Sequence, residues 1–436
     1  MNTKIIILFF LSFISLQAQE VLTQQKAIEL ALENNFGVKM ANNNVEIEKN
    51  NTDILNSDYL PTITANGGAV ANLNNIDAEF SNGTSTSLTN AKSSNYNASI
   101  NLNYTIFDGF GREYNYKRLK EQYNLSELEA KETIENTLIE LFSVYYSVAQ
   151  LKENVKSLTE TLDISKKRLS RTEYQFEYGQ NTKLGVLNAE VDINNDSINI
   201  INAIQQLKNA KRNLNVIIGN TLKEDFDINT DVDFSMYANK EEMLESAKQN
   251  NTTLLKTEKN IAISELNMKI TKAGFLPVIG VNGSYGWSKN NNNAASFLSV
   301  ATNTGLTAGL TVSWNLFDGG SNITAAKNAK INIENQKLQQ QNNILNIERD
   351  FNNAWDDYHN KYQIYLIQER NINTSKNNFD RTLEKFQIGQ ATSIEFRQAQ
   401  LNLLNAELSR NQAKYETKFA ELQLLQLSGE LLNLKF

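Results

Sequence analysis

The sequence predicts an α plus transmembrane β fold, in which four amphipathic strands and very long helices come from two copies of one unit. The phrase Phe-x-x-Gly-Gln-x-Thr occurs at 176–182 and again at 386–392, an offset of 210 residues. Four segments alternate between apolar and polar residues, as half-buried strands do. Only two prolines occur in 436 residues, against an average of about 5 %, so long uninterrupted helices are possible.

The first residues have the pattern of a secretory leader. Lys4 precedes an apolar run from Ile5 to Leu11, and small residues surround Ala18. This run is shorter than the roughly 20 residues of a membrane-spanning helix. We therefore expect a signal peptide at 1–18, cleaved after Ala18 or Gln19, rather than an anchor.

The repeat extends over nearly the whole chain. Tyr-Leu-Pro at 59–61 matches Phe-Leu-Pro at 275–277, and Phe-Asp-Gly at 107–109 recurs at 317–319. A tandem duplication explains these matches. The expected parts are a first repeat at 19–221, a solvated linker at 222–240 and a second repeat at 241–436. The offset changes by six residues between the two landmarks, which predicts a longer loop in the first copy.

The two landmarks mark junctions between helix and strand. A proline ends a helix and leaves the preceding residue extended, and an aspartate followed by glycine can cap a helix and bend the chain out of a sheet. The predicted junction residues are Pro61, Pro277, Asp108, Gly109, Asp318 and Gly319.

The predicted strands alternate over 97–106 and 306–316, and a further strand follows each Leu-Pro. Each has about 10 to 12 residues, enough to cross a bilayer when tilted. A soluble sandwich shows the same alternation, but the flanking segments offer no second sheet. An interfacial aromatic girdle could come from Tyr104, Tyr285, Trp287 and Trp314.

Four strands do not close a barrel, and open edges are not tolerated in lipid. The sequence therefore predicts an oligomer. Two chains give about eight strands, whose interior side chains fill, whereas three chains give twelve strands and room for a lumen.

About 70 residues without proline follow each Phe-Asp-Gly landmark, with apolar residues at steps of three and four. This spacing is typical of a coiled-coil seam, and such a helix is roughly 100 Å long. Gly179 and Gly389 are expected to end these helices, and Thr182 and Thr392 to cap the returning helices. Thr392-x-x-Glu395 completes a capping box, which Gly185 interrupts in the first copy.

Composition excludes several classes of protein. The net charge of -7 and the lack of a basic patch argue against nucleic-acid binding. The chain has no cysteine, and its single histidine has no cluster of partners, so no metal or cofactor is expected. No constellation of catalytic residues is present, so the protein is not expected to be an enzyme.

Two functions remain open on these grounds. One is a passive conduit that draws its energy from a partner pump. The other is a structural or adhesive coiled-coil protein of the cell envelope, whose strands form a cap through which nothing passes. The polar strand faces, together with the interfacial aromatics, favour the conduit.

Taken together, the residues resemble the outer membrane efflux protein (TolC-like) family. The resemblance covers the mature chain: Leu22-Thr23 followed by Ala27 and Leu30, the two Leu-Pro junctions, the Phe-Asp-Gly landmarks and the duplicated Gly-x-x-Thr tips. It implies a homotrimer with a twelve-stranded barrel in the outer membrane of a Gram-negative bacterium and a periplasmic α-barrel of antiparallel coiled coils.

The resemblance also implies a function and partners. The chain would be the exit duct of a tripartite efflux or type I secretion system, in contact with outer-membrane lipid, a periplasmic adaptor (membrane fusion) protein and an inner-membrane transporter. The positions similar to the adaptor contacts are Tyr178, Gly179, Gln180, Thr182, Ile388, Gly389, Gln390 and Thr392. The positions similar to the periplasmic gate are Glu395, Gln398 and Phe386.

Overall fold

The computed structural model describes residues 21–56, 58–223, 226–235, 237 and 239–433. The predicted signal peptide lies outside the described residues. The first half contains β1 (Val21–Leu22), α1 (Gln24–Asn34), α2 (Phe36–Asn51), η1 (Ile54–Asn56), β2 (Thr62–Glu79), β3 (Ser85–Phe107), α3 (Gly111–Glu177) and α4 (Lys183–Ile217). The second half contains β4 (Asp227–Ile228), α5 (Lys240–Asn250), α6 (Thr252–Ala273), β5 (Val278–Asn291), β6 (Val300–Ser313), α7 (Ser321–Gln387), α8 (Ser393–Leu427) and η2 (Leu431–Asn433).

The chain forms two compact units, each built from both halves of the sequence. One unit combines 1–42, 129–254 and 343–436, and the other combines 43–128 and 255–342. The first contains the helical hairpins and the connection between the halves, and the second contains the four-stranded sheet. The two sequence copies therefore do not correspond to the two spatial units, because each unit contains segments of both copies.

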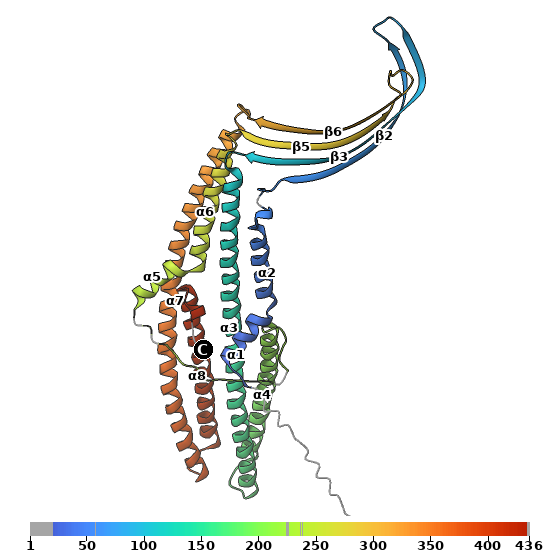
Figure 1. Cartoon of the computed structure of the whole chain (residues 1–436). Helices are drawn as coiled ribbons and strands as arrows, with labels where there is room; N and C mark the ends of the chain where they lie inside the picture. The colour runs from blue at the N-terminus through green and yellow to red at the C-terminus, as the bar shows by residue number, and fades with distance from the viewer. Residues whose placement is uncertain (1–20, 57, 224–225, 236, 238, 434–436) are drawn as a thin grey trace, which may run out of the picture. The chain divides into compact units, whose positions relative to one another are not determined.

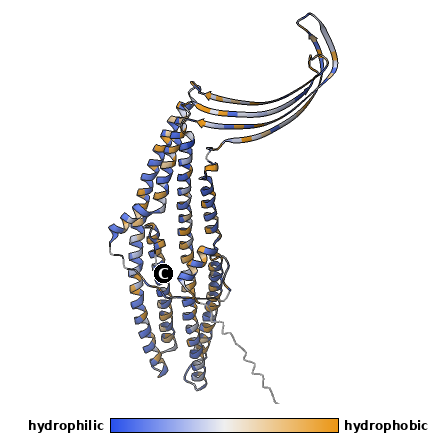
Figure 2. Ribbon diagram, in the orientation of Figure 1, coloured by the Kyte–Doolittle hydropathy of each residue, from blue (hydrophilic) through white to orange (hydrophobic). Residues whose placement is uncertain are grey.

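The sheet unit has the strand order β2-β3-β5-β6, with every neighbouring pair antiparallel (Figure 1). Ile100 lies opposite both Ala65 and Tyr285, and Tyr285 lies opposite Leu306, so one face collects the apolar residues of all four strands. Figure 2 shows the alternation along each strand. In the single chain this apolar face is open, and Leu306 is 77 % exposed. The predicted alternation is confirmed.

The strands are longer than predicted. β2 and β3 have 18 and 23 residues, and β5 and β6 have 14 each. The first hairpin turns at 80–84, a shorter connection than 292–299 in the second, so the prediction of a longer loop in the first copy was wrong. The additional residues extend the ladder, because a bulge between Asn74 and Ile76 restores pairing beyond it.

The last strand ends earlier than its alternation predicts. β6 stops at Ser313, whereas the pattern continues to Leu316. The indole of Trp314 donates a hydrogen bond of 3.1 Å to the carbonyl of Phe275. This contact turns the chain away from the ladder, and periodicity alone does not reveal it.

The aspartates at the junctions cap the long helices. Pro277 lies between the end of α6 and the start of β5, whereas α2 already ends at Asn51, so Pro61 does not end that helix as predicted. Asp108 accepts a hydrogen bond from the Arg112 amide at 2.7 Å, and Asp318 accepts one from the Asn322 amide at 2.8 Å, so each aspartate caps a long helix. Gly109 has a φ of 72°, and a Cβ there would lie 2.5 Å from the carbonyl oxygen of Ala273. Only glycine fits this bend.

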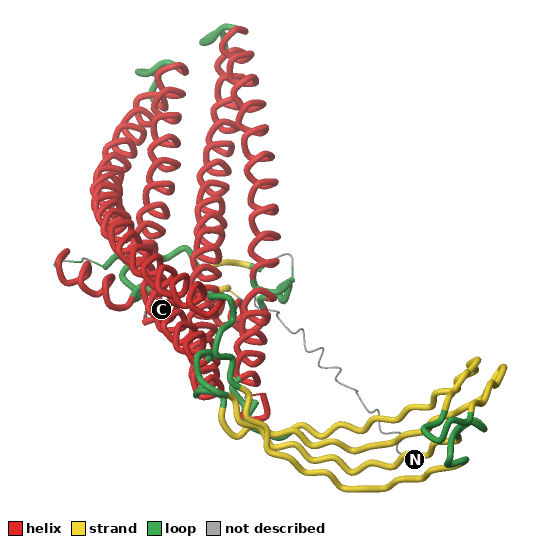
Figure 3. Tube along the Cα trace, turned by 90° about the horizontal axis from the view of Figure 1, so that it is seen from above, coloured by secondary structure: helices red, strands yellow, loops and turns green. Residues whose placement is uncertain are grey.

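The helical unit contains two hairpins, whose long helices begin in the sheet unit (Figure 3). α3 and α7 have 67 residues each, and the returning helices α4 and α8 have 35 each. The predicted long helices and their tips are confirmed. The core is mostly aliphatic, and its largest side chains are aromatic, with Phe142, Tyr145, Tyr146, Phe351 and Tyr358 almost fully buried.

The connection between the two halves packs against both hairpins, while Asp231 and Asp233 are exposed as expected of a solvated linker. Phe226 and Ile228 are buried, and β4 pairs with β1 in parallel. Helix side chains donate hydrogen bonds to its carbonyls along its length. The pairs are Lys211 to Phe226, Lys152 to Ile228, Tyr145 to Asn229, Lys414 and Tyr415 to Thr230, Lys418 to Asp233 and Tyr358 to Ser235.

No helix in the described part of the chain is long and apolar enough to cross a membrane. Within the same residues, no three His, Cys, Asp or Glu side chains gather where they could hold a metal ion.

Candidate functional site at the hairpin tips

Both hairpin tips are built on the same backbone motif. The Gly179 amide donates to the carbonyl of Phe176, and the Gln180 amide donates to that of Gln175 at 2.7 Å. These two bonds form a Schellman motif, which requires a left-handed residue, and Gly179 has a φ of 72°. The second tip repeats the pattern at Gly389, with a φ of 79°. The duplicated phrase is therefore a helix stop followed by a reversal.

The returning helix starts with a threonine cap in both copies. Thr182 accepts a hydrogen bond from the Gly185 amide, and Thr392 accepts one from the Glu395 amide, both at 3.2 Å. In the second tip the Glu395 carboxylate also accepts from the Thr392 amide at 2.8 Å, which completes the predicted capping box. The hydrogen bonds from the Thr392 amide and hydroxyl hold the pKa of Glu395 below its ordinary value of 4.5.

The first tip presents its large side chains to solvent. Tyr178 is 79 % exposed, and Tyr174, Phe176 and Leu184 are also exposed. The Lys183 ammonium lies 5.9 Å from the centre of the Phe176 ring. Beside them is an open groove of about 470 Å³, which is lined by Ser170, Glu173, Tyr174, Phe176, Glu177, Lys183 and Val186.

The second tip buries its aromatics inside the hairpin. The rings of Phe386 and Phe396 stack at 4.8 Å, and Phe379 lies 5.5 Å from Phe396. All three side chains are buried, whereas Ile388 and Ile394 are exposed. The two tips therefore share a backbone and present different surfaces.

The residues similar to the family's gate do not cluster. Phe386 packs within the hairpin core. Glu395 is engaged in the capping box, and the Gln398 amide donates to Asn402 at 2.9 Å, one turn further along α8. Each of the three residues is therefore held by contacts within its own hairpin.

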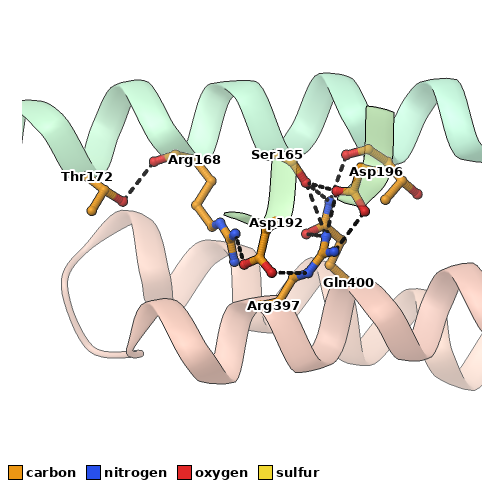
Figure 4. A network of polar contacts seen from close by, with 8 residues as sticks. Ser165, Arg168, Thr172, Asp192, Asp196, Arg397 and Gln400 are labelled. Carbon is orange, nitrogen blue, oxygen red and sulfur yellow. Dashed lines mark hydrogen bonds and ion pairs between the residues drawn. The ribbon is translucent and has the colours of Figure 1, made fainter. Parts of the chain in front are cut away.

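A buried polar cluster joins the two hairpins a few turns from the tips (Figure 4). Arg397 of α8 donates to both carboxylate oxygens of Asp196 of α4, each at 2.8 Å. Asp196 is 3 % exposed and also accepts from the Ser165 hydroxyl of α3 at 2.6 Å. Gln400 adds hydrogen bonds to Ser165 and to the carbonyl of Thr161. We call Ser165, Arg168, Asp192, Asp196, Arg397 and Gln400 the interhairpin cluster.

The charges of the interhairpin cluster balance. Arg168 pairs with Asp192, whose other oxygen lies 3.6 Å from Nε of Arg397. A third arginine, Arg171 of α3, donates to the carbonyl of Gln387 and lies 5.5 Å from the centre of the Phe386 ring. A cation at the C-terminus of α7 also favours the helix dipole. Each hairpin therefore contributes an arginine that contacts the other hairpin.

Sequence patterns did not reveal the interhairpin cluster. Asp192 and Asp196 stand four residues apart, which places them on one face of α4. Their partner Arg397 is about 200 residues away, and the register between two hairpins cannot be read from periodicity. The aspartate pair is the only local signal, and it does not specify a partner.

The sequence model of the family described as "Outer membrane efflux protein" matches residues 27–220 and again 243–430. The chain belongs to the outer membrane efflux protein family. The recognition made from the sequence is confirmed, and membership places the protein in the outer membrane of a Gram-negative bacterium with an extension into the periplasm.

Individual relatives agree with the family. The chain is 21 % identical to the outer membrane protein TolC of Vibrio cholerae over 308 residues, which is 69 % of each chain. It is 21 % identical to the outer membrane efflux protein BepC of Brucella suis over 412 residues, 93 % of this chain and 85 % of BepC. The matches are channels and efflux proteins, not enzymes.

The fold is shared with solved channels. The crystal structure of the CmeC outer membrane channel of Campylobacter jejuni superposes with a TM-score of 0.76 at 16 % identity, over 94 % of this chain and 86 % of that one. The predicted fold class is thereby confirmed at the level of one chain.

Proposed function

We propose that three copies of the chain close their sheets into one twelve-stranded barrel and form the passive exit duct of a tripartite efflux or secretion system. The observation that carries this proposal is the four-stranded sheet itself. Its outer strands, β2 and β6, have free edges, one of its faces is apolar, and the other is polar. A free edge in lipid leaves backbone groups unpaired, so the edges must meet other strands.

The apolar face has the features of a lipid-facing surface. Tyr104 stands near one end of the face on β3 and Tyr96 near the other, roughly 27 Å apart along an extended strand. Trp314 adds to the end near Tyr104, and Trp287 adds to the end near Tyr96. Aromatic residues that flank an apolar band of about 25 Å are typical of outer-membrane barrels.

The closure of the duct follows from strand number. Twelve strands leave a water-filled interior, whereas the eight of a dimer would be filled by side chains. Nothing in the described residues suggests an energy source within the chain, so the flow is driven by partners: an inner-membrane transporter and a periplasmic adaptor that meets the tips. The exposed tip residues Tyr178, Gln180, Ile388 and Gln390 are the proposed adaptor contacts.

The main test is the assembly and its conductance. Protein extracted from outer membranes in detergent should have the mass of three chains and should form discrete conductance steps in planar bilayers. A monomer without conductance would contradict the proposal and would favour the structural coiled-coil alternative.

The adaptor contacts can be tested in cells. Tyr178→Asp and Ile388→Asp place a charge on each exposed tip and should abolish export while trimer abundance in the outer membrane stays unchanged. Glu190→Gln, on α4 away from the tip, is the matched control. Normal export by both tip variants would show that the adaptor does not bind at the tips.

We propose that the three copies of Glu395 in the trimer form a ring of carboxylates that narrows the periplasmic end of the duct. The Glu395 carboxylate is exposed while it completes the capping box, so the two roles are compatible. Glu395→Gln keeps a side chain that can cap and removes the charge. Unchanged cation selectivity of this variant in planar bilayers would exclude the ring.

A further inference from the structure

The polar face of the sheet carries no ionisable side chain over most of its length. The register brings Thr64, Asn101 and Ser284 onto one face, and the same alternation holds along all four strands. The polar-face positions are Thr62, Thr64, Asn66, Gly68, Val70 and Asn72 of β2; Ser93, Asn95, Asn97, Ser99, Asn101, Asn103 and Thr105 of β3; Val278, Gly280, Asn282, Ser284, Gly286, Ser288 and Asn290 of β5; and Ala301, Asn303, Gly305, Thr307, Gly309, Thr311 and Ser313 of β6.

The charged residues of the strands lie elsewhere. Lys92 stands opposite Leu73, and Lys289 stands opposite Tyr96, so both belong to the apolar face at its far end. Asp77 and Glu79 come after the bulge between Asn74 and Ile76. The neutral surface is therefore continuous from Thr62 to Asn72 and across the facing parts of the other strands.

Several amide and hydroxyl groups of this face bond to one another. Ser284 donates to the side-chain amide oxygen of Asn101 at 2.8 Å, and Thr311 donates to that of Asn282 at 3.2 Å. Asn95 and Asn290 are paired across the strands. Their hydrogen-bonding capacity is partly satisfied by the wall, so a passing solute is held only weakly.

Glycines on the neighbouring strands leave room for these amide side chains to lie against the sheet. A Cβ added at Gly68 would stand 2.8 Å from the amide oxygen of Asn97, and one at Gly309 would stand 3.1 Å from that of Asn282. The side chains of Asn97 and Asn282 therefore extend over the neighbouring glycines. The wall is smooth as well as neutral.

We propose that this face is a charge-indifferent wall, so that the barrel itself, as distinct from its periplasmic end, selects cargo by size and not by sign. The inference rests on the proposed function, because it requires that the polar face line the water-filled interior. Its cargo class is polar or amphiphilic organic solutes of either charge or none. A path dedicated to transition-metal cations would need carboxylate, imidazole or thioether ligands, and the neutral face has none.

The chain contains no cysteine, so a single introduced thiol reports the local potential. We would introduce Asn101→Cys and, separately, Thr307→Cys on the same face of β6, and reconstitute each full-length variant in phosphatidylcholine vesicles. Each thiol is treated with a cationic and with an anionic methanethiosulfonate. The ratio of the two rates is compared with that of free 2-mercaptoethanol.

The measurement is made at 0.01 M salt, where the Debye length is about 30 Å and fixed charges act across a lumen. At a neutral wall the rate ratio should equal that of the free thiol within about twofold and should not change at 1 M salt, where screening is nearly complete. A clear preference for one reagent that disappears at 1 M salt would overturn the inference and leave the duct in place.

Two further variants make the result decisive. Ser284→Asp added to either cysteine variant places a carboxylate directly opposite the thiol, about 5 to 6 Å away. It should raise the ratio of cationic to anionic rates about tenfold, because one charge at that distance in water changes each rate about threefold in opposite directions. No change in the ratio would mean that the method does not sense wall charge, and the inference would be withdrawn.

A further cysteine variant tests which face of the sheet meets lipid. Leu102→Cys lies next to Asn101 in sequence but on the opposite, apolar face, so lipid should protect it from both reagents. Equal reactivity of Leu102→Cys and Asn101→Cys, or an unreactive thiol at both Asn101 and Thr307, would contradict the proposed duct itself. These outcomes are distinct from a sign preference, which affects only the wall.

Discussion

The two hairpin tips have nearly the same backbone and are held by different side chains. Each ends its long helix with a Schellman glycine and starts the return with a threonine cap. The second tip adds a capping box and a buried cluster of three phenylalanines, whereas the first leaves Tyr174, Phe176 and Tyr178 in solvent. A duplicated phrase can therefore fix a turn twice and still leave each copy free to build its own surface.

Arg397→Ala should have the largest effect, because the interhairpin cluster is the only place near the tips where the two hairpins share buried charge among the described residues. The substitution leaves Asp196 buried without its main partner, which costs about 3 to 5 kcal/mol of unfolding free energy. Denaturant unfolding, followed by the helical signal, measures this loss of unfolding free energy. Lys167→Ala is the control, since it removes the exposed Lys167–Asp163 pair of α3 and should cost less than about 1 kcal/mol.

Phe396→Ala should show that the two tips are stabilised by different side chains. The ring is buried between Phe379 and Phe386, so its loss should cost about 3 kcal/mol. Tyr178→Ala in the first tip removes an exposed ring and should change the unfolding free energy by less than about 0.5 kcal/mol. Equal losses, measured on the same denaturant curves, would mean that the tips are not held differently.

Gly179→Ala and Gly389→Ala should affect the tips equally. Both glycines have a positive φ, and an added Cβ would meet no atom within 4 Å at either one. The cost is therefore purely conformational, about 1 to 2 kcal/mol in each tip. Thermal unfolding of the two variants tests this, and a difference larger than about 1 kcal/mol between them would contradict a shared backbone.

The smallest expected difference is the pH dependence of the second tip. Because hydrogen bonds from Thr392 lower the pKa of Glu395 in the folded state, its carboxylate stabilises the fold above a pH of about 4.5, and this contribution is lost as the pH falls through the folded-state pKa. Glu395→Ala should therefore be less stable than the wild type near pH 7 and nearly equal to it near pH 3. Gly185→Ala, at the matching position of the first tip, should show no such convergence.

Local signals predicted much of this protein. The alternation of the strands, the aspartate caps at 108 and 318 and the glycine stops at 179 and 389 each depend on residues close together in sequence. The capping box at Thr392 was readable for the same reason. Strand length was predicted less well, because the bulge at Asn74 and the indole contact of Trp314 decide where pairing continues and stops.

The sequence by itself determined the two copies of the unit, the kind of each element, the points where the chain reverses and the chemistry of the two sheet faces. These follow from periodicity and backbone preference, which act over a few residues. Only the tertiary structure decided that Arg397 meets Asp196, that helix lysines and tyrosines hold the connection from Phe226 to Ser235, and that the tips differ in burial. Such contacts depend on the register between segments up to 200 residues apart, and that register is set by packing of the whole fold.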